Sequence, residues 1–147
     1  MKRFVRYTCF VLVVAMVLAI PIFASETAEP KGSNFFMRSS VYLCEVSSNY
    51  FEAWFEVTGV RTMDEIGANQ IKIQRSSDGV HWTTMVTCPK EEFTYFVAYN
   101  TSGHAAGVRY GPVPGYYYRA YVELYAKKGV NVGYMDHYSA PVYIPAN

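Results

Sequence analysis

Apolar and polar residues alternate along most of this chain, and this two-residue period constrains the fold more than any other feature of the sequence. Within residues 50–58, Phe51, Phe55 and Val57 occupy one set of alternating positions, and Glu52 and Glu56 occupy the other. Because successive side chains of a strand point to opposite faces, the segment is predicted to form a strand with one buried face and one wet face. Such strands are typical of antiparallel sheets.

The same period recurs in other short segments, and turn signals separate them. The predicted strands are residues 38–46, 50–58, 70–76, 80–88, 92–100, 116–126 and 130–139. Asp78-Gly79 is a strong signal for a hairpin turn. Residues 58–69 are expected to be a connection that holds one helical turn at 63–66. Residues 100–115 contain four glycines and two prolines and are expected to form a long loop.

Seven short strands without crossover helices predict an all-β fold. We expect a two-layer antiparallel β-sandwich, in which each sheet buries one face against the other. A parallel α/β architecture is excluded because it requires helices between its strands. A closed barrel is the alternative.

The N-terminus has the composition of an export signal. Three basic residues fall within the first six positions, an apolar run of 14 residues follows at 10–23, and the small residue Ala24 ends it. We expect cleavage after Ala24, hence a signal peptide at 1–24, a flexible leader at 25–36 and a sandwich domain at 37–147. The alternative is a membrane anchor, but the run contains Pro21 and is shorter than the roughly 20 residues that span a bilayer.

The charge of the exported chain bears on its partners. Removal of residues 1–24 leaves 10 basic and 12 acidic residues, a formal charge of −2. A nearly neutral domain has no general electrostatic attraction for nucleic acid or an anionic membrane. We therefore expect a secreted, extracellular protein whose partner is a glycan or another protein, with no nucleic acid, no stable membrane insertion and no cofactor.

Two cysteines, Cys44 and Cys88, remain in the exported chain. In an oxidising compartment they could form a disulfide, which would stabilise the fold by about 4 kcal/mol for a loop of about 44 residues. Two separately buried thiols are the alternative.

Two motifs resemble those of known proteins. They comprise the hairpin residues Ile71, Ile73, Gln74, Arg75, Gly79 and Trp82, and the strand residues Tyr116, Tyr118 and Arg119. With the signal segment, these motifs resemble a group of small, uncharacterised secreted proteins of Gram-positive bacteria. The layout is also similar to fibronectin type III and immunoglobulin-like sandwiches. The resemblance implies fold and export, and it carries no catalytic residue.

Residues with catalytic or metal-binding chemistry are sparse. The three histidines stand alone, without the spacing of a zinc site, and no hydrolase motif is present. We therefore expect a non-enzymatic binding module. One alternative is a small secreted hydrolase that uses His104, Asp136 and His137. The other is a structural envelope protein that self-associates through an edge strand.

The candidate binding residues lie on the tyrosine-rich strand. Period two places Tyr117, Tyr121 and Tyr125 on its outward face, roughly 13 Å apart in succession, with Arg119 between the first two. Such a stripe could stack on sugar rings or anchor a protein. Cross-strand packing of aromatic side chains is the alternative explanation. Trp54, between two glutamates, is a second candidate.

Overall fold

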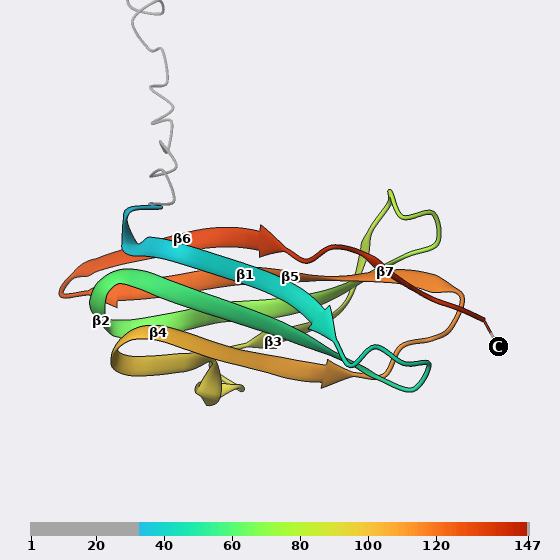
Figure 1. Ribbon diagram of the computed structural model, residues 1–147, viewed down its shortest axis with the longest axis horizontal. Helices are drawn as coiled ribbons and strands as arrows, with labels where there is room; N and C mark the ends of the chain where they lie inside the picture. Colours follow the sequence, from blue (N-terminus) through green and yellow to red (C-terminus); the bar gives the residue numbers. More distant parts are fainter. Residues whose placement is uncertain (1–32, 147) are drawn as a thin grey trace, which may run out of the picture.

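The computed structural model describes residues 33–146, and this part of the chain is a single curled antiparallel sheet (Figure 1). Two short 3-10 turns, η1 (Ser33–Phe35) and η2 (Thr94–Phe96), accompany the strands. The strands are β1 (Phe36–Cys44), β2 (Phe51–Ser76), β3 (Thr83–Pro89), β4 (Val97–Tyr110), β5 (Tyr116–Lys128), β6 (Asn131–Tyr138) and β7 (Val142–Ile144). The expectation of an all-β fold is therefore confirmed. No helix in this range has the length and apolar character needed to cross a membrane.

Strand β2 is 26 residues long and runs through the whole sheet. The connection and helical turn expected at 58–69 are wrong, because this segment continues β2. Met63, Ile66 and Ala68 are fully buried there. The adjacent charges, Asp64 and Glu65, do not mark a loop, since they pair with lysines of β5.

The neighbours of β2 change along its length, and this curls the sheet. Residues 51–58 pair with β1 on one side and with β4 on the other. The ladder with β4 continues to Gly67, residues 65–76 pair with β5, and residues 70–75 also pair with β3. Register shifts in β2 interrupt its ladders with β4 and β5, and such irregularities increase bending.

The curl brings the two ends of the sheet together without a backbone ladder. Strands β1 and β6 end the pairing path β1-β2-β5-β6, and Figure 1 shows them next to each other. Ser39 Oγ lies 3.1 Å from His137 Nδ1 across this seam. The sheet is thus a half-barrel with a seam of side chains among its described strands.

Residues 100–110 belong to β4, so the long loop expected at 100–115 is reduced to the turn between β4 and β5. The glycines that suggested a loop instead permit close packing. A Cβ atom at Gly107 would lie 2.6 Å from the carbonyl oxygen of Ala53 and 2.9 Å from ring atoms of Trp54. Glycine therefore lets the Trp54 side chain lie across β4.

The structure also changes two predicted boundaries. Strand β3 begins at Thr83 rather than at residue 80, because Asp78 Oδ1 accepts hydrogen bonds from the backbone N–H groups of Val80 and His81. The flexible leader was expected to end at residue 36, but Phe36 is buried and begins β1. The predicted signal peptide and residues 25–32 of the leader lie outside the described residues.

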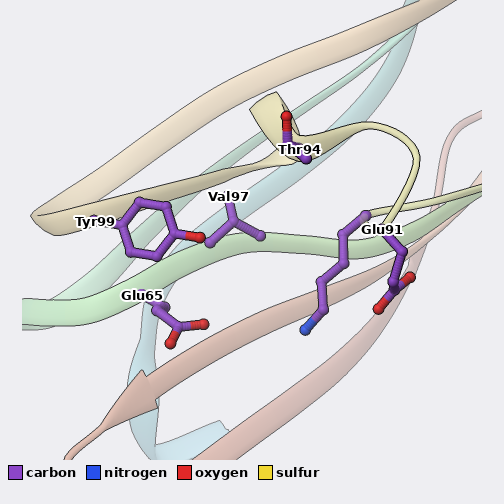
Figure 2. A pocket seen from close by; sticks show the side chains of 6 residues that line it. Glu65, Glu91, Thr94, Val97 and Tyr99 are labelled. Carbon is purple, nitrogen blue, oxygen red and sulfur yellow. The ribbon is translucent and has the colours of Figure 1, made fainter.

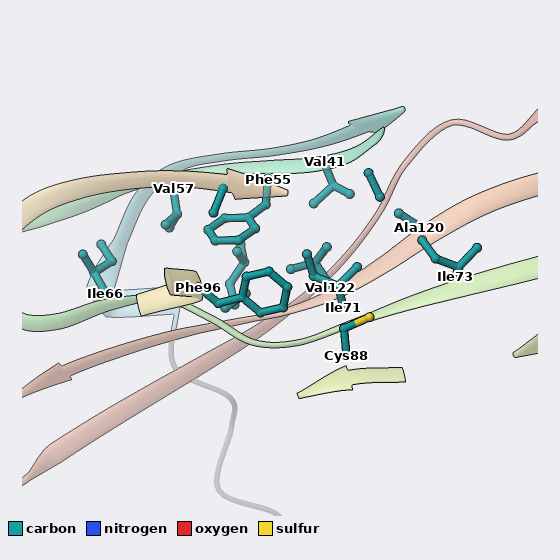
Figure 3. Packing of buried hydrophobic residues seen from close by; sticks show 14 of the residues in the cluster. Val41, Phe55, Val57, Ile66, Ile71, Ile73, Cys88, Phe96, Ala120 and Val122 are labelled. Carbon is teal, nitrogen blue, oxygen red and sulfur yellow. The ribbon is translucent and has the colours of Figure 1, made fainter. Parts of the chain in front are cut away.

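The inner face of the sheet encloses one apolar core. Phe55 and Phe96 meet edge to face with their ring centroids 6.2 Å apart. Figure 3 shows Phe55 on one side of the cluster, and Ile71 and Val122 on the other. Burial of this side-chain set is the main source of stability for the domain.

We predict that Gly67→Ala destabilises the domain. A Cβ atom at Gly67 would collide with the carbonyl group of Phe96, where η2 crosses β2. The collision involves backbone on both sides, so the free energy of unfolding should fall by about 1–3 kcal/mol. Urea denaturation monitored by circular dichroism measures the change.

Gly111→Ala is the matched control. The nearest atom to its new Cβ would be the Asn49 carbonyl oxygen at 3.6 Å, an ordinary contact. Its free energy of unfolding should stay within about 0.5 kcal/mol of the wild-type value. Equal stability of the two variants would contradict the close approach at Gly67.

Candidate binding face

The outer face of β5 carries three tyrosines, and each is paired with a tyrosine of β6 or β7. The ring centroids are 4.9 Å apart in Tyr117–Tyr143, 5.1 Å in Tyr121–Tyr138 and 5.6 Å in Tyr125–Tyr134. We call these six residues the tyrosine face. The alternation in β5 identified three of them. The cross-strand register, which depends on the turn after Lys128 and on the placement of β7, gives each of these three its partner.

The tyrosine face has an open end and a covered end. At the open end, the side chains of Tyr138 and Tyr143 are 48% and 47% exposed. At the covered end, Tyr125 is only 5% exposed. Only the open end is therefore accessible to a large ligand.

Contacts from two other strands and a loop bury Tyr125, so the expectation that it faces a ligand is wrong. Its hydroxyl group donates to Glu65 Oε2 at 2.8 Å, and Lys90 Nζ lies 3.8 Å from the centre of its ring. Burial, followed by the hydrogen bond to Glu65, raises the pKa of Tyr125. Tyr125 is thus a neutral packing residue around physiological pH.

A small hollow lies beside Tyr125. Its lining residues are Glu65, Lys90, Glu91, Thr94, Val97 and Tyr99. Figure 2 shows Glu65 and Glu91 toward opposite ends of this hollow. Glu65 is held by Lys127, whose Nζ lies 2.9 Å from Oε1. The hydrogen bonds from Lys127 and Tyr125 lower the pKa of Glu65, so its charge is compensated within the fold.

The middle of the face is fixed by polar contacts. The hydroxyl group of Tyr121 donates to Asp136 Oδ1 at 2.9 Å, and Lys72 Nζ lies 5.2 Å from the centre of the Tyr121 ring. Burial and then the Asp136 carboxylate raise the pKa of Tyr121. These contacts orient the ring and leave part of its surface accessible.

Arg119 contacts two aromatic side chains next to the open end. Its guanidinium carbon lies 4.3 Å from the Trp82 ring and 4.5 Å from the Tyr138 ring. Its Nε donates to Gln74 Oε1 at 2.8 Å. The sequence marked Arg119 as a candidate, whereas Trp82 was identified only as a hairpin residue. Its role depends on how the β2–β3 hairpin packs beside β5.

Trp54 lies on the other outer face of the sheet, away from the tyrosine face. It belongs to the half of β2 that pairs with β1 and β4, and its Nε1 donates to Glu52 Oε2 at 3.0 Å. A shallow groove there is lined by Tyr42, Cys44, Glu45, Glu52, Trp54, Glu56 and Ala105. Trp54 therefore cannot extend the tyrosine face.

Cys44 and Cys88 are both free in the structure, so the disulfide is not formed. Cys88 is buried in the core opposite Ile71. Cys44 lies across from Glu52 on the outer face, and its Sγ is 3.6 Å from the Glu52 carbonyl oxygen. The two thiols thus face opposite sides of the sheet. Burial raises the pKa of each thiol.

The residues considered for a hydrolase have separate partners. His104 Nε2 lies 2.8 Å from the Tyr95 carbonyl oxygen. His137 contacts Ser39 on the inner side of the seam, whereas Asp136 accepts a hydrogen bond from Tyr121 on the outer face. No contact between described residues joins the three. Residues 33–146 also contain no group of three or more potential ligands that could hold a metal ion.

The fold and this surface define an all-β domain with an aromatic outer face. No family model matches the chain, and no curated protein matches it. Among solved structures, it is similar to the sporulation control protein Spo0M of Bacillus subtilis, with a TM-score of 0.44 and 11% identity. The similarity covers 75% of this chain and 49% of that chain, so this chain spans about half of Spo0M. Similarity at this level carries no argument about function.

We predict that Glu65→Gln weakens the acid dependence of stability. The pKa of Glu65 is lower in the folded state, so the unfolded state binds more protons near and below the ordinary value of 4.5. The contribution of Glu65 is present above that pH and is lost as the pH falls through the folded pKa. The free energy of unfolding of the variant should therefore fall less steeply than that of wild type between about pH 5 and pH 3.

Urea denaturation across this pH range measures the effect, and Glu91→Gln is the control. Glu91 is exposed and forms no ion pair with any residue the structure describes. Its variant should keep the wild-type acid dependence. Solvent screening limits the loss from Glu65→Gln at neutral pH to less than about 1 kcal/mol. Identical pH profiles for wild type and Glu65→Gln would contradict the assignment.

Proposed function

We propose that this protein is a secreted, non-enzymatic binding module that holds a glycan of the cell wall or another extracellular surface against the open end of the tyrosine face. The observation that carries the proposal is the pair of half-exposed rings, Tyr138 and Tyr143, each packed on a β5 tyrosine. Tyrosine suits this use because it presents a rigid apolar ring together with a polar hydroxyl group.

The arrangement of the face supports ligand binding as well as sheet packing. Packing alone accounts for Tyr125, whose ring is covered and whose hydroxyl group is satisfied by Glu65. It does not account for Tyr138 and Tyr143, which keep about half of their surfaces in water. Side chains that are exposed but already held rigidly in this way lose little conformational entropy when a ligand binds.

Export and the sandwich class are parts of the same proposal. The basic, apolar and small-residue pattern of 1–24 supports secretion. The all-antiparallel pairing of the described strands, with inner faces that enclose one core, supports a relationship to fibronectin type III or immunoglobulin-like sandwiches. A rigid β-scaffold that presents a site on one sheet face suits a binding module.

We predict that the combined change Tyr117→Ser, Tyr138→Ser and Tyr143→Ser abolishes binding to purified Gram-positive cell walls. The three changes remove the accessible rings of the open end but leave the buried Tyr125 intact. Loss of stacking at about 1 kcal/mol or more for each ring should weaken binding by at least a hundredfold in total. Pull-down with insoluble walls and a glycan array measure this binding.

Tyr99→Ser is the matched control, because Tyr99 is 66% exposed and does not belong to the tyrosine face. Circular dichroism and thermal unfolding must show that both variants are folded. Equal binding by wild type and the triple variant would show that the face is sheet packing. Absence of binding by wild type would remove the glycan proposal.

A second candidate function, self-assembly as a structural element of the envelope, is favoured by the edge of β3. Among the described strands, β3 pairs only with β2, and its seven residues include no charged side chain. Such an edge can add a strand from another molecule. The register shift opposite Ile73 and Gln74 twists this edge and opposes such pairing.

We predict, under this second candidate, that wild type forms oligomers as its concentration rises and that Thr87→Lys does not. Thr87 is exposed on β3, and a lysine on an edge strand disfavours pairing with a second chain. Sedimentation velocity over a hundredfold range of concentration measures the association. A strictly monomeric wild type would eliminate this candidate.

A further inference from the structure

The guanidinium group of Arg119 is held in one orientation but lacks an acidic partner among residues 33–146. The rings of Trp82 and Tyr138 both contact it, and Gln74 accepts the hydrogen bond from its Nε. Its two terminal NH2 groups donate to no side chain or carbonyl group within this range, and no carboxylate lies within ion-pair distance. Four N–H donors of a fixed, planar cation are therefore unused.

This arrangement differs from that of Arg109, which also contacts an aromatic ring. Arg109 lies over Tyr50, and both its Nε and Nη2 donate to Glu52 Oε1, at 3.0 and 2.6 Å. The neighbouring carboxylate satisfies that guanidinium group. At Arg119 the acceptor is instead the amide oxygen of Gln74. This neutral group orients the plane of the guanidinium group but does not neutralise its positive charge.

A planar guanidinium group that is already oriented is a strong receptor for an oxyanion. Its paired N–H groups match the oxygen spacing of a carboxylate or a phosphate, and charge-assisted hydrogen bonds are stronger than neutral ones. Contact with two rings and the hydrogen bond to Gln74 remove much of the side-chain freedom that binding would otherwise have to restrict.

We propose that Arg119 binds the oxyanion of an anionic saccharide, a carboxylate or a phosphate, while a sugar ring of the same ligand contacts Tyr138. This inference rests on the proposed function and specifies its ligand class. The stack places the cation next to the most exposed ring of the β5–β6 pairs, so one ligand can contact both groups. Lys72, beside Tyr121, adds a second positive charge to the same face.

The acidic side chains of this face are engaged in other contacts. Asp136 accepts the hydroxyl hydrogen bond of Tyr121, and Glu123 Oε2 accepts hydrogen bonds from Asn69 and Gln70 at 2.6 and 3.3 Å. Glu123 lies four residues from Arg119 along β5, which corresponds to roughly 13 Å. The oxyanion site is therefore distinct from the acidic part of the face.

Isothermal titration calorimetry with three probes tests the inference. The probes are a galacturonic acid oligomer, the same oligomer with its carboxylates methyl-esterified, and a galactose oligomer that carries phosphate groups. The first two differ only in charge, and the third distinguishes a phosphate ligand from a carboxylate ligand. Wild type should bind at least one anionic probe about tenfold more tightly than the neutral ester.

Three variants assign this preference to Arg119. Arg119→Gln should remove the preference for the anionic probe, and Arg119→Lys should reduce it to about threefold, because an ammonium group keeps the charge but lacks the paired, planar donors. Arg61→Gln makes the same change of net charge at an exposed position and should bind like wild type. Thermal unfolding of each variant verifies the fold.

The outcomes separate this inference from the proposed function. Wild type that binds neither anionic probe more tightly than the ester, with loss only in the tyrosine variant, would overturn the inference and leave glycan binding intact. Equal anion preference in Arg119→Gln and wild type would also overturn it. Absence of binding to all three probes and to cell walls would overturn both. If the Arg119 variants fail to fold, the affinities of the wild-type protein for the anionic probes and for the neutral ester still test the inference.

Discussion

The continuity of β2 is the constraint on which the rest of the structure depends. Strands β1, β3, β4 and β5 all pair with it, and β6 and β7 join the sheet through β5. Because one strand belongs to both halves of the curled sheet, the inner faces must turn toward each other. Phe55 from the first half and Ile71 from the second consequently share one core.

The same arrangement creates two separate outer faces with different characters. One lies over β1, the first half of β2 and β4, where Trp54 and Glu52 contact each other. The other lies over β3, the second half of β2, β5, β6 and β7, and carries the tyrosine face. Within that second face, Lys90 covers one end, while the Arg119 stack and Tyr143 remain accessible at the other. One ladder of tyrosines is therefore covered at one end and exposed at the other.

Two-residue alternation shows directly which face of a strand is buried. The sequence therefore predicted the all-β class and, for most strand positions, whether a side chain points toward the core or away from it. It failed where a residue serves tertiary packing rather than local conformation. Gly107 makes room for Trp54, and Gly67 makes room for η2, so both glycines lie inside strands instead of marking loops. The approach of Trp82 to Arg119 depends on the contact between a hairpin and a distant strand, which no local pattern encodes.

The order in which the strands of this sheet emerge from the ribosome has a kinetic consequence. The second half of β2 can pair early with β3, its hairpin partner, but its longest ladder is with β5, as in the pairing of Ile71 with Val122. Pairings between such distant segments form slowly, because closing the long loop between them costs conformational entropy before any stabilising contact forms. The core therefore cannot close until the chain has been synthesised at least through Lys128. A nascent chain with this topology keeps its apolar inner face open until β5 has been made.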